Sequence, residues 1–134
     1  MTEIVGSCAC GQVTYKIKGT VWDCCYCHCS ICRKLSGSSA AAYGTVDRNQ
    51  FEWTSGQEVL QFFQPTTKSK RHFCSRCSSF LLTEHEIEPD NVLVTLGTID
   101  DQLNQKIEYR QFSKDRPAWS RSKTKIQDYP EMAG

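Results

Sequence analysis

The sequence predicts a small, mainly β domain made of packed β-sheets. Apolar residues alternate with polar ones in segments 12–19 and 91–99, a period of two that is typical of half-buried strands. Turn-like stretches such as "VDRNQ", "TSGQE" and "EPDN" separate further short apolar segments. Many short strands with frequent turns between them indicate sheets that pack on one another.

Eight strands are expected in chain order. They are placed at residues 12–19, 40–46, 51–54, 59–64, 70–74, 80–86, 91–99 and 106–112. One helical turn interrupts the pattern in "SICRKLSG", where Ser30 is the expected N-cap and Gly37 follows the last helical residue. Residues 1–134 are expected to form a single domain, with an irregular tail from about residue 113.

The net charge and the N-terminal sequence indicate where in the cell the protein is expected. The formal net charge of +1 provides no overall attraction to nucleic acid or to an anionic membrane. No apolar run is long enough to span a bilayer, and "MTEIVGSCACG" lacks the basic start and apolar stretch of a secretory signal. A cytoplasmic location is therefore expected. In that reducing compartment, nine cysteines, an odd count, favour metal ligands or catalytic thiols over stable disulfides.

Seven of the nine cysteines fall into three blocks with metal-ligand spacing. The blocks are Cys8-Ala-Cys10, Cys27-His-Cys29-Ser-Ile-Cys32 and Cys74-Ser-Arg-Cys77. A structural zinc takes four ligands, typically from two short groups that are distant in sequence. The pair at 74 and 77 is therefore expected to join the pair at 8 and 10 in one closed zinc site. The triplet remains as a three-ligand site, the pattern of a catalytic zinc, because its fourth position stays open.

Local geometry supports the triplet. In an extended strand Cys27 and Cys29 point to one face, and a following helical turn brings Cys32 near Cys29. His28 points to the other face, so it is expected to be a packing or supporting residue rather than a ligand.

Alternatives remain for the other two cysteines and for the function. Cys25 shares the face of the triplet by period two and could close that site as a fourth ligand, whereas Cys24 is expected to pack as a small buried hydrophobe. The C-x-x-C at 74–77 alone could be a redox motif, although it lacks the strand-to-helix context of one. A non-catalytic interaction module with purely structural zinc is the stronger alternative.

Three segments, "GSCACGQVTY", "CHCSICRKLSG" and "HFCSRCSSFL", together resemble the glutathione-dependent formaldehyde-activating enzyme family, which includes the centromere protein V-like proteins. The resemblance extends over roughly residues 6–119. It implies a zinc-containing β fold similar to methionine sulfoxide reductase B, with two zinc ions per chain. The implied ligands are Cys8, Cys10, Cys74 and Cys77 for a structural zinc, and Cys27, Cys29 and Cys32 for a catalytic zinc.

The implied activity is that of a carbon–sulfur lyase similar to S-hydroxymethylglutathione synthase, with glutathione or its formaldehyde adduct as the small-molecule partner. Two departures from the family pattern stand out. Ser78 follows the C-x-x-C where similar sequences commonly have glycine, so the backbone turn there is expected to differ. The doublet Cys24-Cys25 is also not part of the pattern.

Basic residues supply candidate substrate contacts. Arg33 and Lys34 directly follow the last triplet ligand and could retain an anionic tripeptide, or they could lie on a solvated turn. Lys68, Lys70 and Arg71 could bind a glycine carboxylate, but a solvated strand edge is the favoured interpretation. A basic stripe between 110 and 125 is the one feature that favours nucleic acid or an acidic protein, and this remains the second-ranked function.

Overall fold

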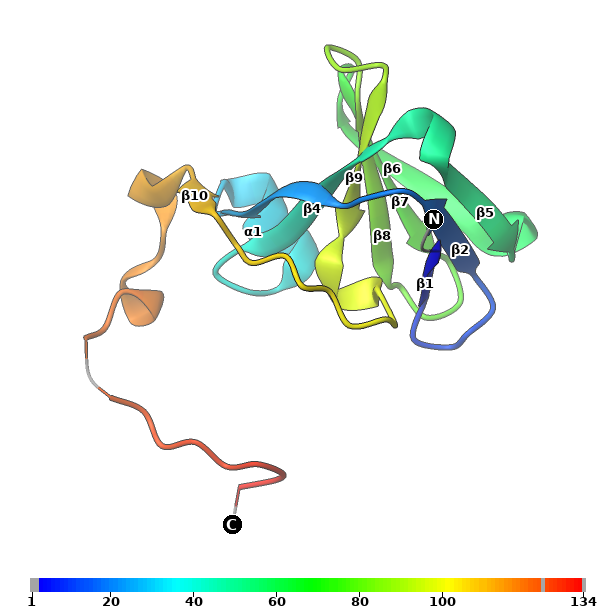
Figure 1. The fold of residues 1–134 in the computed structure, drawn as a ribbon. Coiled ribbons are helices and arrows are strands. Elements are labelled where there is room, and N and C mark those ends of the chain that lie inside the picture. Colours follow the sequence, from blue (N-terminus) through cyan, green and yellow to red (C-terminus); the bar gives the residue numbers. More distant parts are fainter. Residues whose placement is uncertain (1–2, 124, 134) are drawn as a thin grey trace.

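The structure is a computed structural model and describes residues 3–123 and 125–133. Its strands form two sheets (Figure 1). The smaller sheet has the order β1-β2-β5, and the larger has the order β10-β3-β4-β9-β8-β7-β6. The strands are β1 (Glu3–Ser7), β2 (Thr14–Lys18), β3 (Trp22–Cys27), β4 (Ala41–Asp47), β5 (Phe51–Ser55), β6 (Leu60–Thr66), β7 (Ser69–Cys74), β8 (Phe80–His85), β9 (Asn91–Thr95) and β10 (Tyr109–Gln111).

The mainly β prediction is confirmed, and each of the eight expected segments contains a strand. Two strands were not predicted, β1 and β3. In β3, Asp23 has a φ of 54°, and the register with β4 shifts between Trp22 and Cys25. This irregularity breaks the period-two pattern that would have marked the segment as a strand.

Within the described residues there is one α-helix, α1 (Ser30–Ser36), and it follows β3 closely. Its N-cap is Cys29 rather than the expected Ser30, because the Cys29 Sγ accepts a hydrogen bond from the Cys32 N–H at 3.3 Å. Gly37 ends the helix with a φ of 67°, as expected of a residue in the left-handed region. Short 3-10 turns lie at Arg48–Gln50, Gln57–Val59, Leu96–Thr98, Ser113–Asp115 and Ala118–Ser120.

Two groups of buried side chains stabilise the fold. The larger group contains residues of both sheets, among them Tyr15 and Ile17 of β2 and Leu82 of β8. The smaller group surrounds the start of α1 and consists of Cys25, Cys27, Cys32, Ala41 and Tyr43. Most of the second group are thiols, so this region offers sulfur atoms where a purely structural core would offer aliphatic side chains.

β10 pairs with β3 in parallel, which joins Tyr109 to Cys25 and Gln111 to Cys27 in the register. The other strand pairs are antiparallel. Beyond β10 the described chain has no further strand and extends away from the sheets (Figure 1). Within the described residues no helix is long and apolar enough to cross a membrane.

Candidate metal centres

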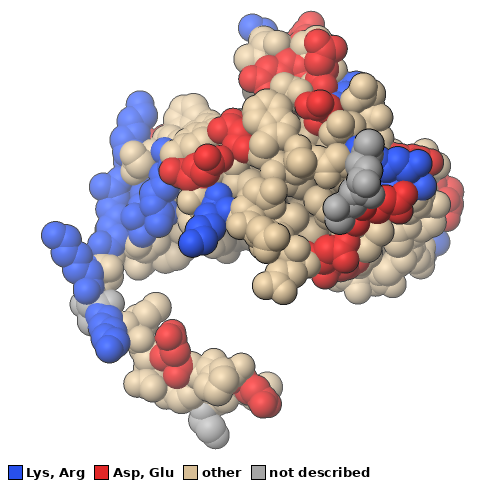
Figure 2. Space-filling view, viewed as in Figure 1, with Lys and Arg blue, Asp and Glu red and all other residues tan. Residues whose placement is uncertain are grey.

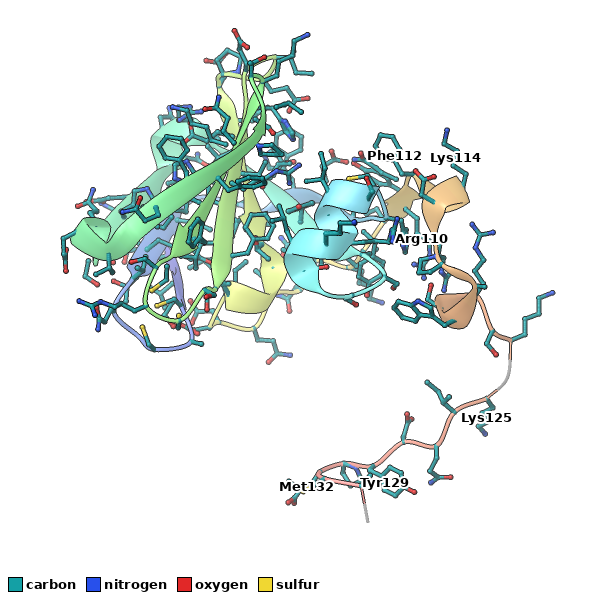
Figure 3. All side chains as sticks on the ribbon, turned by 180° about the vertical axis from the view of Figure 1, so that it is seen from behind. Arg110, Phe112, Lys114, Lys125, Tyr129 and Met132 are labelled. Atoms are coloured by element: carbon teal, nitrogen blue, oxygen red, sulfur yellow. The ribbon has the colours of Figure 1, made fainter. Side chains whose placement is uncertain are left out.

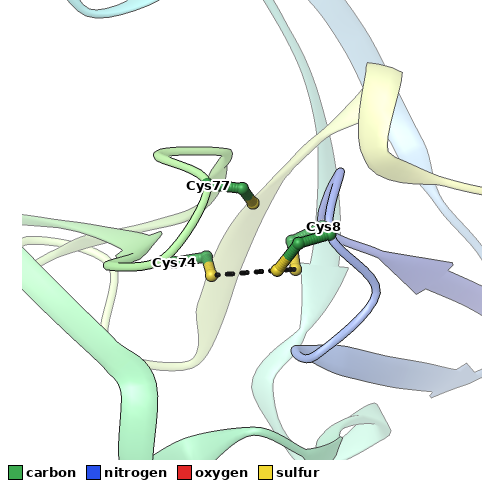
Figure 4. A group of neighbouring side chains, drawn as sticks. Cys8, Cys74 and Cys77 are labelled. Atoms are coloured by element: carbon green, nitrogen blue, oxygen red, sulfur yellow. Dashed lines mark hydrogen bonds between the residues drawn. The ribbon is translucent and has the colours of Figure 1, made fainter.

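Four cysteine sulfurs from two distant connections meet at one end of the sheets (Figure 4). Cys8 and Cys10 lie in the β1–β2 connection, Cys74 ends β7, and Cys77 lies in the β7–β8 connection. The four Sγ atoms lie within 4.8 Å of one another, with 3.6 Å between Cys8 and Cys10 and 3.8 Å between Cys10 and Cys74. The cluster therefore links the three-stranded sheet to the seven-stranded sheet.

These distances fit a tetrahedral zinc site. Zinc–sulfur bonds of about 2.3 Å place two sulfurs of a tetrahedron about 3.8 Å apart. Backbone amides also support the cluster, because the Val13 N–H donates to Cys8 Sγ at 3.3 Å and the Arg76 N–H donates to Cys74 Sγ at 3.4 Å. Such bonds orient thiolates and compensate part of their charge.

The thiols of this cluster differ in acidity. A hydrogen bond with the Ser79 hydroxyl lowers the pKa of Cys77 to about 5, against the effect of burial. The backbone N–H of Gln12 lowers the pKa of Cys10, but burial and the three neighbouring sulfurs outweigh it and raise that pKa to about 11. Without metal the cluster therefore mixes thiols and thiolates, and metal binding must release protons from it.

Ser78 keeps the backbone conformation that glycine would favour. Its φ is 68°, in the left-handed region, and its N–H donates to the Cys74 carbonyl at 2.7 Å. The sequence-based expectation at this departure from the family pattern was a different backbone turn. In the structure, Ser78 adopts the left-handed backbone conformation that a glycine would favour. A side chain at this φ costs about 1–2 kcal/mol.

The second cluster lies where β3 passes into α1. Cys27 ends β3, Cys29 caps α1, and Cys32 lies in its first turn. Their three Sγ atoms lie within 4.8 Å of one another; Cys27 and Cys32 are buried, and Cys29 is half-buried. The helix cap draws Cys29 toward Cys32, so the local fold itself assembles three sulfurs that could hold a metal ion.

The neighbours of the triplet lie where the strand alternation places them. Cys25 lies on the side of the triplet, but it is not in the group of three sulfurs; it accepts a hydrogen bond from Gln111 Nε2 at 3.6 Å. Cys24 packs in the main core on the other face of β3.

His28 is fully buried with both ring nitrogens bonded. Its Nδ1 lies 2.6 Å from the Ser39 carbonyl and must donate to it, so Nε2 accepts from Arg110 Nη1 at 3.1 Å. The ring therefore has no free nitrogen for a metal ion, and its bond to Arg110 links β10 to the segment that carries the triplet.

The thiols of the triplet also differ in acidity. A hydrogen bond from the Cys27 thiol, outweighing burial, lowers the pKa of Cys32 to about 5, with further help from Tyr43, Cys29 and the Arg71 charge. The same Cys27–Cys32 bond, together with burial, raises the pKa of Cys27. Burial and the nearby Cys32 raise the pKa of Tyr43, so that hydroxyl keeps its proton near neutral pH.

A cavity of about 410 Å³ opens onto the triplet. All three triplet cysteines line it, with Tyr43 and Leu93 beside them. One wall comes from β3, β10 and the residue that follows β10: Asp23, Cys25, Tyr109, Gln111 and Phe112. The other wall comes from the end of β6, the turn that follows it, β7, the end of β8 and the residues after β8: Thr66, Lys68, Ser69, Arg71, His85, Ile87 and Glu88. A cavity of this size is typical of a small-molecule site.

The positions of the basic residues relative to the cavity differ from the sequence-based expectation. Arg33 and Lys34 do not line this cavity, and Arg33 Nε donates to the His28 carbonyl at 3.1 Å. Lys68 and Arg71 do line it. The expected solvated strand edge is wrong for Arg71, because β7 lies between β6 and β8 and the side chain is only 6% exposed.

The cavity walls also contain residues that sequence reasoning missed. Asp23, Tyr109 and Gln111 meet there through a chain of hydrogen bonds, in which the Tyr109 hydroxyl donates to Asp23 at 3.0 Å and accepts from Gln111 Nε2 at 3.3 Å. They are brought beside the triplet by the parallel pairing of β10 with β3. A parallel pair between segments so far apart leaves no local signal in the sequence.

Comparison with known proteins is consistent with this architecture. A family model described as glutathione-dependent formaldehyde-activating enzyme matches residues 3–115. A protein of Halomonas elongata, provisionally named as a glutathione-dependent formaldehyde-activating enzyme, is 29% identical over 130 residues, covering 92% of this chain and 83% of the relative. The crystal structure of a Rhodobacter sphaeroides protein superposes with a TM-score of 0.65 at 22% identity, covering 78% of this chain and 98% of the other, which shows a shared fold. The likeness to methionine sulfoxide reductase B stays a prediction.

Proposed function

The chain belongs to the family of glutathione-dependent formaldehyde-activating enzymes, and we propose that it is a zinc-dependent enzyme of the carbon–sulfur lyase type. Its substrate in this proposal is the glutathione adduct of formaldehyde or of a related small aldehyde. The observation that carries the proposal is the convergence of three cysteine sulfurs on the wall of a 410 Å³ cavity. A purely structural cluster would not need an adjoining cavity of substrate size.

In this proposal the chain acts as a single zinc-binding domain with two zinc ions and works in the cytoplasm. Cys8, Cys10, Cys74 and Cys77 hold a closed structural zinc, whereas Cys27, Cys29 and Cys32 hold the second ion. When bound, a zinc ion with an open fourth position can lower the pKa of a thiol or polarise a carbonyl. Cys25 is outside the triplet group, which supports an open rather than a four-cysteine site.

The reaction itself is a redox-neutral addition. The glutathione sulfur forms a bond to the aldehyde carbon, the π electrons of the carbonyl move to its oxygen, and that oxygen takes up the proton that the thiol released. The product is S-hydroxymethylglutathione, and the reverse reaction breaks the same carbon–sulfur bond. The chain has to bind the tripeptide and place its sulfur by the triplet while limiting water.

The cavity walls offer a partner of opposite charge for each kind of charged group on the tripeptide. Glutathione carries two carboxylates and one ammonium group, and the cavity presents Lys68 as well as the carboxylates of Asp23 and Glu88. We assign a substrate carboxylate to Lys68 and the ammonium group to the acidic side chains. Because Arg33 and Lys34 lie outside the cavity, the geometry supports Lys68 over these two residues as the contact to the tripeptide.

The alternative of a nucleic-acid or acidic-protein module finds less support. Lysines and arginines do gather over the segment beyond β10 (Figure 2), and Arg110 and Lys114 lie near the sheets while Lys125 lies on the extended tail (Figure 3). Three of the arginines, however, serve the fold. Arg110 bonds to His28 and lies over the Tyr26 ring, and Arg116 and Arg121 donate to nearby hydroxyl or backbone oxygens. Cations committed in this way are less available to phosphates.

The test combines metal content with exchange kinetics. The purified protein is expected to hold two zinc ions per chain, and a chelator should remove the three-ligand ion first because that ion has fewer protein bonds and a path to solvent. Exchange NMR with ¹³C-formaldehyde and glutathione should show adduct exchange that becomes faster with the two-zinc protein and returns to the uncatalysed rate after partial chelation. A single zinc per chain, or exchange at the uncatalysed rate, would contradict the proposed function.

A further inference from the structure

Arg71 is a buried cation that pairs with no carboxylate among the described residues. Its residue is 6% exposed, and the ion pairs found within the described residues join other side chains: Lys16 with Glu52, and Glu84 with both Arg48 and His72. Its Nε is buried and has no hydrogen-bond partner in the described part of the chain. Burial of a charge is costly unless an opposite charge compensates it, so the fold requires an anion near this guanidinium.

The contacts of Arg71 point toward the triplet. Its Nη1 lies 2.8 Å from the Tyr43 hydroxyl, 3.3 Å from Thr83 Oγ1 and 3.8 Å from Cys32 Sγ. All three partners are buried. These contacts converge on the Cys32 sulfur, which carries a negative charge when it binds a metal ion.

The direction of the hydrogen bonds follows from the chemistry of arginine. A guanidinium has only donors, so the Tyr43 oxygen accepts from Arg71, and the single phenol proton must point elsewhere. The Cys32 Sγ lies 3.2 Å from the Tyr43 oxygen and is the acceptor for that proton. The chain of bonds thus runs from Arg71 to Tyr43 to Cys32 and ends on a sulfur that accepts, as a metal-bound thiolate does.

We propose that Arg71 and Tyr43 form a positioning pair that supplies the counter-charge to the Cys27–Cys29–Cys32 metal site and fixes the Cys32 sulfur within it. This inference rests on the proposed function, which puts a metal ion in the triplet. Three thiolates on one Zn²⁺ carry a net charge of −1, and the single charge of Arg71 balances it. Hydrogen bonds to a ligand sulfur also withdraw electron density from it, which leaves a bound metal a stronger Lewis acid.

The effect of the pair on Lewis acidity would be largest for a metal ion bound by three thiolates. A centre with three thiolates is electron-rich, so its Lewis acidity is weak unless the protein reduces sulfur donation. The Tyr43 hydroxyl does this at Cys32, the most deeply buried sulfur of the triplet. Among the described residues, the triplet sulfur that this pair contacts is that of Cys32, so the effect of the pair acts on that one ligand.

The test is Tyr43→Phe, which removes only the hydroxyl, with Thr83→Val as the matched control. Thr83 also contacts Arg71 Nη1 and is fully buried, but no contact joins it to the triplet sulfurs. With cobalt(II) in place of zinc, Tyr43→Phe should shift the sulfur-to-cobalt charge-transfer band of the triplet site to longer wavelength, because the Cys32 sulfur becomes a stronger donor. Zinc affinity of that site should fall about tenfold, the lower end of the usual effect of a lost supporting bond. Thr83→Val should leave the band and the affinity near their wild-type values.

Arg71→Met and Arg71→Lys test the charge. Arg71→Met should lose the second metal faster to a chelator than Tyr43→Phe does, and Arg71→Lys should restore part of the retention; if Arg71→Met does not fold, Tyr43→Phe still decides the proposal. A wild-type protein with two metal ions whose Tyr43→Phe variant keeps the band and the affinity unchanged would overturn the positioning pair alone. A wild-type protein with one metal ion would overturn it together with the proposed function.

Discussion

The Sγ atoms of Cys10 and Cys74 lie 3.8 Å apart although the two residues are 64 positions apart in the sequence. This contact closes the long chain segment between the β1–β2 connection and the end of β7. The triplet, by contrast, is assembled from one strand end and one helical turn. The two clusters should therefore affect stability in different ways, although both consist of cysteines.

Cys74→Ser should be largely insoluble or molten, whereas Cys32→Ser should keep a cooperative folded core. Structural zinc binding contributes about 10–16 kcal/mol in small zinc peptides, which is comparable with a total domain stability of about 5–15 kcal/mol. The triplet closes little chain and adds little to stability. Thermal unfolding with metal analysis on both variants checks this. If Cys32→Ser unfolds as badly as Cys74→Ser, the triplet is structural and its catalytic assignment fails.

Cys25→Ser should leave the zinc content and the glutathione turnover nearly unchanged. Cys25 lies outside the group of three sulfurs, and its bond from Gln111 can also be accepted by a serine hydroxyl. Metal analysis and exchange NMR on the variant give the readouts, and Cys27→Ser is the positive control that should lose the second zinc. A comparable loss of zinc from Cys25→Ser would show a closed site with four cysteines and would favour the non-catalytic alternative.

Lys68→Ala should raise the KM for glutathione with little change in kcat. Lys68 lines the cavity on the wall opposite Asp23, and an exposed charge-assisted contact to a carboxylate that is remote from the reacting bond predicts roughly a three- to tenfold effect. Lys70→Ala is the matched control, because the Lys70 ammonium lies 4.9 Å from the centre of the Phe62 ring and does not line this cavity.

Lys34→Ala serves as a second comparison for the same measurement. Lys34 lies two positions after the last triplet cysteine in sequence but outside the cavity. A larger rise in KM for Lys34→Ala than for Lys68→Ala would return the substrate contact to the helix and refute the assignment to the cavity wall.

Ser78→Gly should stabilise the protein by about 1 kcal/mol. The φ of 68° at this position is strained for serine and unstrained for glycine, although glycine gives back part of the gain through the entropy of the unfolded chain. Chemical denaturation of the zinc-loaded protein measures the difference. Ser38→Gly is the control, since this exposed residue has no positive φ and its replacement should slightly destabilise the protein. Equal effects of the two substitutions would show that the Ser78 backbone is not strained.

The strands that sequence could predict are those with a clean local signal. In β2 and β9 every second residue is buried, so the alternation in the sequence reports the structure directly. β3 was not predicted because Asp23 interrupts the alternation. Cysteines also lie on both faces of this strand, so its sequence does not distinguish a polar face from an apolar one. β1 was not predicted because only one of its five residues is buried, so its sequence shows little alternation of apolar and polar residues.

The two cysteine clusters could be predicted because metal coordination imposes ligand numbers and spacings that are visible in the sequence. Their surroundings could not. Arg71 was expected on a solvated edge, since a basic residue between other basic residues gives no hint that β7 is an inner strand. Tyr43 lies next to Cys32 only because β4 packs beside α1, and Gln111 lies next to Cys25 only because β10 pairs with β3. Such contacts depend on the tertiary arrangement, which local patterns do not encode.

The separation between the two halves of the closed cluster also has a consequence during synthesis. Cys8 and Cys10 leave the ribosome before Cys74 does. Cys74 is added 64 positions after Cys10, which at about 5–20 residues per second is a delay of about 3 to 13 s. The triplet is complete as soon as the first turn of α1 has been made. The nascent chain therefore contains the complete triplet before Cys74 and Cys77, the other two ligands of the four-cysteine cluster, have been added. The site that is expected to lose its metal most readily in the finished protein is thus the one that can receive it earliest.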